Sequence, residues 1–146
     1  MDETLKKYIL ENLPYSKPFL FADNILSYTE NEITGEYTFT DDEFFYKGHF
    51  INNPVTPGLI LVECMGQIGL VGFALALTYP QFPYKPMLSV VESEFMKSVY
   101  PGEKVKVISK KVYFRNNILK CNISMINSIG EEVAKTTAIL TLVETK

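Results

Sequence analysis

The sequence predicts an α+β fold in which one long apolar helix packs against an antiparallel sheet of about six strands. Two features predict it: residues 59–79 form a long apolar run with a single charge, and strand-like segments separated by turn residues fill most of the remaining chain. A helix that is apolar on every side must be covered by protein on every side, and a sheet wrapped around it provides that cover.

The whole chain, residues 1–146, is expected to form one domain. It is long enough to bury a core of ordinary size, and no linker or low-complexity segment divides it. Hydrophobic residues make up 47% and charged residues 21%, a balance typical of globular proteins. The formal net charge of −3 argues against a nucleic-acid partner, which would require a basic face.

Local signals define the elements that precede the long helix. Residues 2–13 have the apolar spacing of a short helix, which Asp2 can cap and Pro14 ends. Residues 24–29 and 32–40 flank a polar turn, and the second of these segments alternates apolar and polar side chains. We therefore expect a short helix followed by a pair of strands.

The long helix is expected to begin with Thr56 as its N-cap and Pro57 in its first position, and to end before Pro80. Three glycines lie within it: Gly66, Gly69 and Gly72. Each glycine costs a helix about 1 kcal/mol relative to alanine, so we expect another backbone to approach closely there.

A membrane span is the alternative interpretation of this segment, because about 20 apolar residues suffice to cross a bilayer. However, no cluster of lysine or arginine flanks it. Glu63 and Gln67 also share one face, and lipid would penalise both side chains. We therefore expect a buried core helix and no membrane span.

The second half of the chain is expected to be all sheet. Four segments have strand composition: residues 87–95, 104–114, 118–126 and 132–143. Short intervals rich in Pro, Gly and Asn separate them, and this spacing predicts an antiparallel meander.

The two cysteines, Cys64 and Cys121, have no paired spacing. They are expected to be buried free thiols in a reducing compartment. The acidic start of the chain does not resemble a secretory signal, so the predicted location is cytoplasmic.

Residues 47–67, KGHFINNPVTPGLILVECMGQ, contain the candidate catalytic groups. His49 is the single histidine, and an imidazole can act as a base near neutral pH. Glu63 is flanked by apolar residues, which favour the protonated carboxyl that a general acid needs. Pro57-Gly58 opens the helix, where backbone N–H groups lack partners, and Gly58 lets a substrate oxygen come close.

This set suits removal of a proton α to a carbonyl with loss of a β-leaving group. Taken one at a time, each residue also has a structural interpretation. His49 can be a structural histidine, Glu63 a hydrogen-bonded core residue and Gly58 a turn residue.

The order of the motif resembles a known signature. It resembles the signature of the 3-hydroxyacyl-[acyl carrier protein] dehydratases of the FabZ/FabA type, in the order His49-Phe50, Asn53-Pro54-Val55, Pro57-Gly58, Glu63, Met65 and Gln67. The segments LPYSKPFLFADNIL, DDEFFYKGHF and EFMKSVYPGEKV resemble other parts of that family, so nearly the whole chain is covered in order.

The resemblance implies a hot-dog fold, a curved antiparallel sheet around a central helix. It also implies a homodimer with shared active sites, often assembled further as a trimer of dimers. The substrate would be a 3-hydroxyacyl thioester on the phosphopantetheine arm of acyl carrier protein. The product would be a trans-2-enoyl thioester, made in fatty acid or related lipid and polyene biosynthesis without a metal or redox cofactor.

The resemblance also implies a role for each residue. His49 would remove the C2 proton, and Glu63 of the partner chain would protonate the departing 3-hydroxyl. The Gly58 N–H would polarise the thioester carbonyl. The Val55 carbonyl would orient the His49 ring, and Gln67 would position Glu63.

The chain departs from the family pattern near the expected substrate entrance and tunnel. Ile51-Asn52 stands where the family usually has Pro-Gly, and Asn52 tolerates the left-handed backbone of such a turn. Pro86 falls near the place of a tyrosine that often gates the acyl tunnel. For docking an acidic carrier, Lys97 is the candidate; its alternative is an ordinary solvated lysine.

Two other functions remain open from the sequence. A hot-dog acyl thioesterase would also use a carboxylate near the central helix, and would release free thiol even after a His49→Ala change. A non-catalytic acyl-binding partner of a condensing enzyme would bind without turnover, and would tolerate Glu63→Gln.

Overall fold

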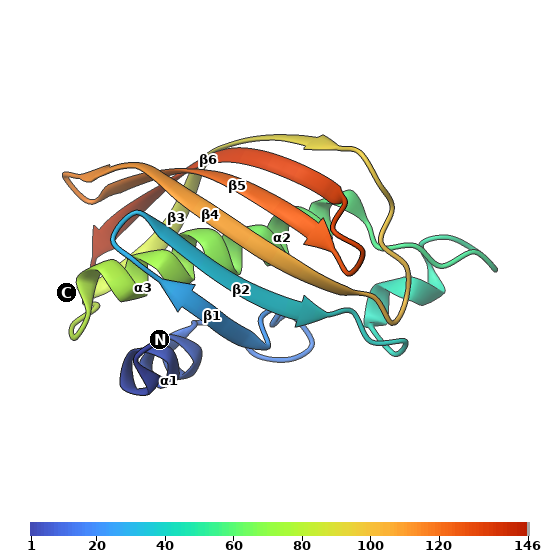
Figure 1. Cartoon of the computed structure of the whole chain (residues 1–146), viewed down its shortest axis with the longest axis horizontal. Helices are drawn as coiled ribbons and strands as arrows, with labels where there is room; N and C mark the ends of the chain where they lie inside the picture. Colours follow the sequence, from blue (N-terminus) through green and yellow to red (C-terminus); the bar gives the residue numbers. More distant parts are fainter. Residues whose placement is uncertain (146) are drawn as a thin grey trace.

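The computed structural model describes residues 1–145 and has one antiparallel sheet curved around a long helix (Figure 1). The strands are β1 (Asn24–Tyr28), β2 (Glu32–Thr38), β3 (Tyr84–Phe95), β4 (Lys104–Arg115), β5 (Ile118–Asn127) and β6 (Glu132–Glu144). The helices are α1 (Glu3–Asn12), the short 3-10 helix η1 (Phe44–Lys47) and the consecutive segments α2 (Gly58–Gly66), η2 (Gln67–Gly72) and α3 (Phe73–Thr78). This architecture confirms the predicted fold class.

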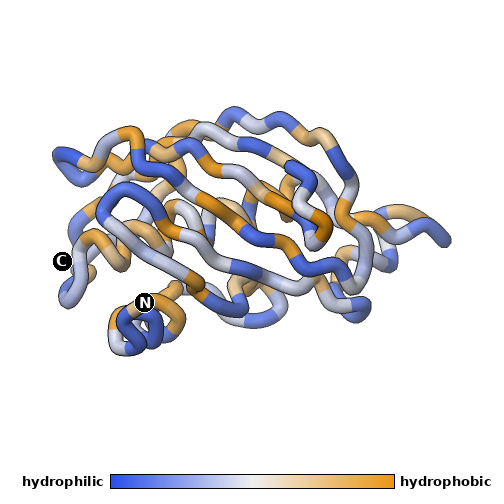
Figure 2. Tube along the Cα trace, viewed as in Figure 1, coloured by the Kyte–Doolittle hydropathy of each residue, from blue (hydrophilic) through white to orange (hydrophobic). Residues whose placement is uncertain are grey.

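The three consecutive segments form one continuous helix that is the core of the molecule. Met65, Ile68, Phe73 and Leu75 are fully buried, and they pack against apolar side chains from the inner face of the sheet. Figure 2 shows hydrophobic and hydrophilic residues alternating along the strands, as expected for a sheet with one buried face. The helix Gly58–Thr78 is apolar and long enough to span a bilayer, but 72% of its most apolar window is buried inside the fold.

The start of the long helix differs from the sequence prediction. The helix begins at Gly58, with Pro57 in the N-cap position and no side chain capping it. The Thr56 hydroxyl is hydrogen bonded to the Tyr46 hydroxyl at 2.6 Å, and the Thr56 N–H donates to the Val99 carbonyl. Thr56 therefore joins the loop before the helix to neighbouring segments and does not cap the helix.

At Gly69 the helix packs so closely against the sheet that a side chain would not fit. A Cβ built on it would lie 2.9 Å from Ser109 Cβ and 3.1 Å from Ile123 Cδ1, and the Ser109 hydroxyl donates to the Gly69 carbonyl at 2.8 Å. At Gly66 the nearest atom to such a Cβ is Leu70 Cδ1, at 3.9 Å. The prediction that another backbone approaches the glycines is therefore wrong at Gly69, where strand side chains make the close contact, and at Gly66, where nothing comes close. At Gly72 the nearest atom is the Gln67 carbonyl oxygen of the same helix, 3.2 Å from such a Cβ.

We predict that Gly69→Ala lowers the free energy of unfolding by about 1–3 kcal/mol, because the added methyl group overpacks the contact with β4 and β5. Gly66→Ala is the matched control on the same helix. It adds a methyl group at ordinary contact distance and is expected to be neutral or to stabilise by up to about 1 kcal/mol. Urea denaturation of both variants measures the difference; equal midpoints would contradict the packing argument.

The strand order corrects the predicted meander. Strands β4, β5 and β6 follow one another as hairpins, but the order across the sheet is β1-β2-β4-β5-β6-β3. Strand β3 pairs with β6 at the edge of the sheet, with Glu94 opposite Lys135. It does not pair with β4, the strand that follows it in the chain. Residues 96–103 cross from that edge to β4 (Figure 1), and Val99 within them is buried. This connection is too long for a tight hairpin.

Candidate active site

The loop that carries His49 is anchored by a buried acid. The 3-10 helix η1 precedes it, and Glu43, at the start of η1, accepts hydrogen bonds from the Tyr37 hydroxyl and the Thr40 N–H. Lys17 donates to the Tyr37 hydroxyl at 3.0 Å and so extends this network to the segment after α1. The network fixes the direction in which the chain leaves the sheet toward His49.

The orientation of the His49 ring is set by its own loop. His49 Nδ1 lies 2.9 Å from the Val55 carbonyl oxygen, and the Val55 N–H donates to the His49 carbonyl at 2.9 Å. A carbonyl only accepts, so Nδ1 carries the hydrogen and Nε2 is left with its lone pair. The Phe50 ring stacks on the imidazole at 3.9 Å. An imidazole in this tautomer can take up a proton at Nε2.

Between His49 and Val55 the chain makes a turn that depends on Asn52. Its φ is +56°, in the left-handed region that asparagine tolerates better than other residues with side chains. Asn52 can therefore adopt the turn conformation that a glycine would otherwise provide.

Glu63 lines a pocket between the central helix and the sheet. The pocket holds about 660 Å³ of empty space, part of it open to solvent. Its lining is mostly apolar and comes from α2, η2, β3, β5 and β6, together with Tyr15. Burial raises the pKa of the Glu63 carboxyl above its ordinary value, and the Gln67 amide partly offsets that rise. A carboxyl in such a place can hold a proton that it later donates.

Gln67 mainly ties another segment to the helix. It is fully buried; its Oε1 accepts from the Phe21 N–H at 2.7 Å, and its Nε2 donates to the Phe19 carbonyl at 2.9 Å. Gln67 also lies beside Glu63, but its two short hydrogen bonds go to the backbone of residues 19–21. These bonds give Gln67 a structural role that the sequence did not indicate, and its role in positioning Glu63 stays a prediction.

Gly58 is the first residue of α2, and its N–H belongs to the turn that has no carbonyl partners within the helix. The Phe95 ring of β3 covers it: a Cβ built on Gly58 would lie 3.1 Å from that ring. The Phe95 ring thus lies against the start of α2. A larger residue at position 58 would push the ring away from the helix terminus.

A single chain does not bring the two candidate catalytic side chains into one pocket. Glu63 lines the pocket described above, but among the described residues that line it there is no histidine. His49 projects from the loop that precedes α2 and is partly exposed. Within residues 1–145, no three His, Cys, Asp or Glu side chains gather into a metal site.

Tyr15 is a pocket residue that sequence reasoning missed. It lines the same pocket as Glu63, and burial, followed by the charge of Glu63, raises the pKa of its hydroxyl to about 12. Thr136, from β6, also faces the pocket and donates to Met65 Sδ at 3.6 Å. The segment containing Tyr15 carried part of the family resemblance, but nothing local connects it with a residue 48 positions later.

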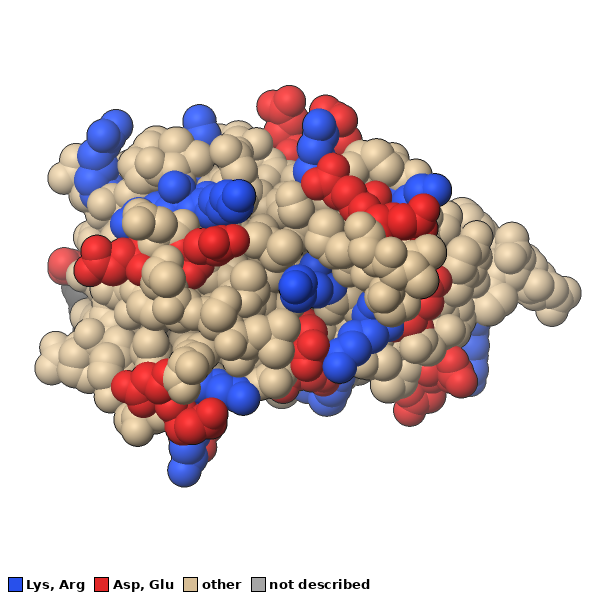
Figure 3. Space-filling view, in the orientation of Figure 1, with Lys and Arg blue, Asp and Glu red and all other residues tan. Residues whose placement is uncertain are grey.

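The predicted docking residue Lys97 has an acidic partner. Its Nζ lies 3.3 Å from Glu131 Oε2, and both side chains are largely exposed. Lys104 and Lys135 are likewise paired with Glu36 and Glu94. Figure 3 shows acidic and basic residues interspersed over the face of the molecule that is seen in Figure 1. Lys97, Lys104 and Lys135 each lie beside a carboxylate, so these three lysines do not form a purely basic surface.

Comparison with known proteins decides the family. Residues 13–138 match the model of the FabA-like domain. The chain belongs to the FabA-like family. It is 34% identical over 140 residues to the 3-hydroxyacyl-[acyl-carrier-protein] dehydratase FabZ of Psychrobacter arcticus, covering 94% of this chain and 92% of that protein. FabZ of Thermus thermophilus is 29% identical over 134 residues, covering 92% of this chain and 94% of its own.

Solved structures of other proteins agree on the fold. The protein smu.793 of Streptococcus mutans, bound to acetyl CoA, superimposes with a TM-score of 0.67 at 17% identity, over 92% of this chain and 98% of that one. A hypothetical thioesterase of Streptococcus pneumoniae with coenzyme A gives 0.65 at 10% identity, over 84% and 87%. At such identities the likeness supports the hot-dog fold alone, whereas the FabZ relatives support the family.

Proposed function

We propose that this FabA-like chain is a 3-hydroxyacyl-[acyl-carrier-protein] dehydratase. The observation that carries the proposal is a partly buried carboxyl, Glu63, with a raised pKa in an apolar pocket, in a chain 34% identical to a FabZ along nearly its full length. The product is the trans-2-enoyl thioester, and water leaves. The pathway class is the synthesis of fatty acids or related lipids and polyenes.

The mechanism assigns one step to each group. The Gly58 N–H donates to the thioester carbonyl oxygen and so makes the C2 proton more acidic. His49 Nε2 takes that proton while Val55 holds Nδ1. Glu63 gives its proton to the 3-hydroxyl, the C3–O bond breaks and water departs. Return of the proton from His49 to Glu63, through water, restores both groups.

The active site is proposed to be shared by two subunits, with His49 of one facing Glu63 of the other. Support comes from β3, an edge strand of twelve residues whose outer side has no partner among the described strands. It exposes several large apolar side chains: Met87, Leu88, Val90, Val91 and Phe95. A long apolar edge suits pairing with a second copy of itself. A trimer of such dimers is the proposed larger assembly.

The partner that delivers the substrate is proposed to be acyl carrier protein in the cytoplasm. Lys97, two residues after the end of β3, stays the candidate contact for an acidic carrier. Its ion pair with Glu131 is exposed, so an incoming carboxylate or phosphate can compete with that pair.

The test is turnover of a 3-hydroxyacyl-carrier substrate, followed by the absorbance of the conjugated enoyl thioester. The expected result is enoyl formation without release of free thiol. Release of free thiol that survives His49→Ala would identify a thioesterase instead. Substrate binding without any turnover, unchanged by Glu63→Gln, would identify an acyl-binding partner and overturn the proposal.

A further inference from the structure

A second pocket lies beyond the one that contains Glu63. It is formed by the end of α1, the helix α3 and the segment that leads into β3, and it holds about 740 Å³ of empty space, part of it open to solvent. Its walls include Tyr8, Leu75, Phe82 and Tyr84. The Phe82 and Tyr84 rings pack edge to face at 5.7 Å, and Tyr8 packs in the same way on Tyr79 at 4.8 Å.

The two pockets are neighbours on three sides. Tyr15 lines the first pocket and Pro14 the second; Val71 lines the first, and Leu75, one helical turn later, lines the second. Pro86 of β3 lines both. The pockets are therefore adjacent compartments, and Pro86 is part of the wall between them.

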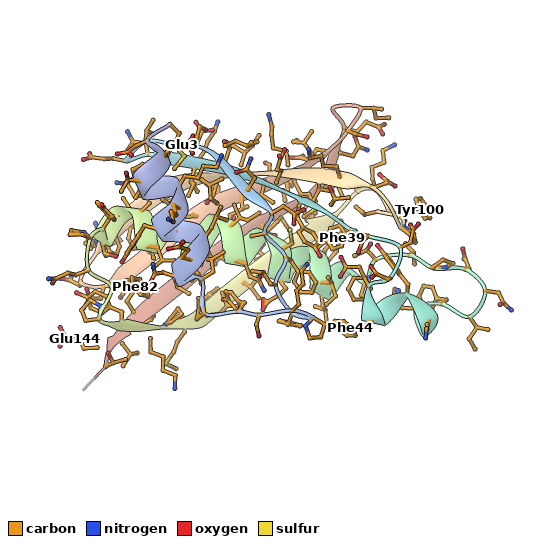
Figure 4. All side chains as sticks on the ribbon, turned by 90° about the horizontal axis from the view of Figure 1, so that it is seen from below. Glu3, Phe39, Phe44, Phe82, Tyr100 and Glu144 are labelled. Atoms are coloured by element: carbon orange, nitrogen blue, oxygen red, sulfur yellow. The ribbon has the colours of Figure 1, made fainter. Side chains whose placement is uncertain are left out.

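The first pocket extends along the helix away from the acid. Beyond Glu63 its helical lining continues to Val71, about 12 Å further at 1.5 Å per residue. The second pocket continues in that direction. Phe82, in its wall, lies toward the left end of the molecule in Figure 4, and Phe44, which begins the helix before the His49 loop, lies to the right of the middle.

An acyl chain that is dehydrated at Glu63 therefore has one direction in which its tail can grow. The reacting C2 and C3 atoms lie at the carboxyl, and the apolar tail follows Leu70, Leu88 and Leu140 toward Pro86. Each methylene of the acyl chain that becomes buried in the apolar pocket strengthens binding. A methylene that reaches the end of the pocket adds no binding energy. The position of the wall then decides the longest chain that fits.

We propose that Pro86 is the specificity-determining residue that ends the acyl pocket and sets the upper length of the acyl chain. The inference rests on the proposed dehydratase function and adds its chain-length selection. Its ring is rigid, because the pyrrolidine fixes the backbone φ. Removing the ring joins the two pockets, so that longer tails reach Tyr8, Phe82 and Tyr84.

The experiment compares Pro86→Gly with the wild-type protein on 3-hydroxybutanoyl, 3-hydroxyoctanoyl, 3-hydroxydodecanoyl and 3-hydroxyhexadecanoyl carrier substrates. The wild-type kcat/KM is expected to rise with chain length and then to fall steeply. In Pro86→Gly the decrease in kcat/KM is expected at longer chains. Each added methylene that becomes buried should raise kcat/KM by about fourfold. Pro86→Ala, which perturbs the strand less, is expected to move the limit in the same direction.

Two controls separate this effect from a general loosening of the strand. Pro83→Gly is the same change three residues earlier, at an exposed residue that is absent from the lining of both pockets, and its length profile should match the wild type. Asn12→Trp fills the second pocket from the exposed side of α1. In the Pro86→Gly protein it should cancel the gain, whereas alone it should leave the profile unchanged.

Binding of the matching acyl-pantetheines, measured by calorimetry, keeps the outcomes separate. If the wild-type protein turns over none of the substrates, the dehydratase proposal is overturned. If its affinities nevertheless show a chain-length limit that moves in Pro86→Gly, the assignment of Pro86 as the end of the acyl pocket is still supported. Length profiles of Pro86→Gly and Pro86→Ala that coincide with the wild type, in both turnover and affinity, overturn the assignment of Pro86.

Discussion

Glu63→Gln is expected to reduce kcat by about 10²–10⁴-fold, the usual contribution of a general acid. Glutamine has nearly the same size and can fill the same space in the pocket, but it cannot give a proton to the departing hydroxyl. The dehydration assay measures the loss, and circular dichroism checks that the fold is intact. The matched control is Glu92→Gln on β3, an exposed residue that lies outside the Glu63 pocket, which should keep wild-type activity.

The pH dependence of the wild-type enzyme follows from the same carboxyl. Burial raises the pKa of Glu63, so the protonated acid persists to higher pH than an exposed glutamate would allow. Activity is therefore expected to fall as the pH rises through that pKa in the folded protein. The pH profile of kcat/KM is also measured for the residual activity of Glu63→Gln. If that profile falls at high pH in the same way as the wild type, it contradicts the assignment of Glu63 as the acid.

Stability should respond to pH in the same direction. Because the folded-state pKa of Glu63 is raised above its unfolded value, folding favours the protonated carboxyl. Its stabilising contribution is complete below the unfolded pKa and is lost as the pH rises through the folded pKa. Glu63→Gln removes this contribution, so the variant should be less sensitive to pH than the wild type in thermal unfolding across that window.

Most of the fold could be predicted from local patterns. The apolar run that became Gly58–Thr78 and the alternation in β2 each identify an element without reference to distant residues. The place of β3 could not be predicted in this way. Whether residues 96–103 form a hairpin or cross the sheet depends on which edge β3 joins, and its pairing with β6 spans about forty residues or more.

In the candidate site, too, local features could be predicted and contacts between distant residues could not. His49, Val55 and Glu63 lie within one short segment, where the type of residue and its spacing already suggest chemistry. The contacts of Gln67 with Phe19 and Phe21 join residues 46 and 48 positions apart, and helix spacing revealed only its neighbour Glu63. Tyr15 enters the pocket by the same tertiary packing. Local sequence therefore suggested the candidate reacting groups but not the residues that surround them.

The largest qualitative effect is expected when two inactive variants are mixed. His49→Ala removes the base and Glu63→Gln removes the acid, so each homodimer should be nearly inactive by itself. If every active site takes His49 from one subunit and Glu63 from the other, a mixed dimer holds one site with both groups intact and one site with neither.

Equimolar variants that are unfolded together and refolded should therefore recover about a quarter of wild-type activity, because about half of the dimers are mixed and each has one working site of two. The two variants refolded separately and then assayed together at once are the control, and they should stay inactive. The expectation follows from the absence of a histidine among the described residues that line the Glu63 pocket of one chain. Inactivity of the co-refolded mixture, with mixed dimers demonstrated by a tag on one variant, would place both groups of each site in a single subunit and contradict the shared site.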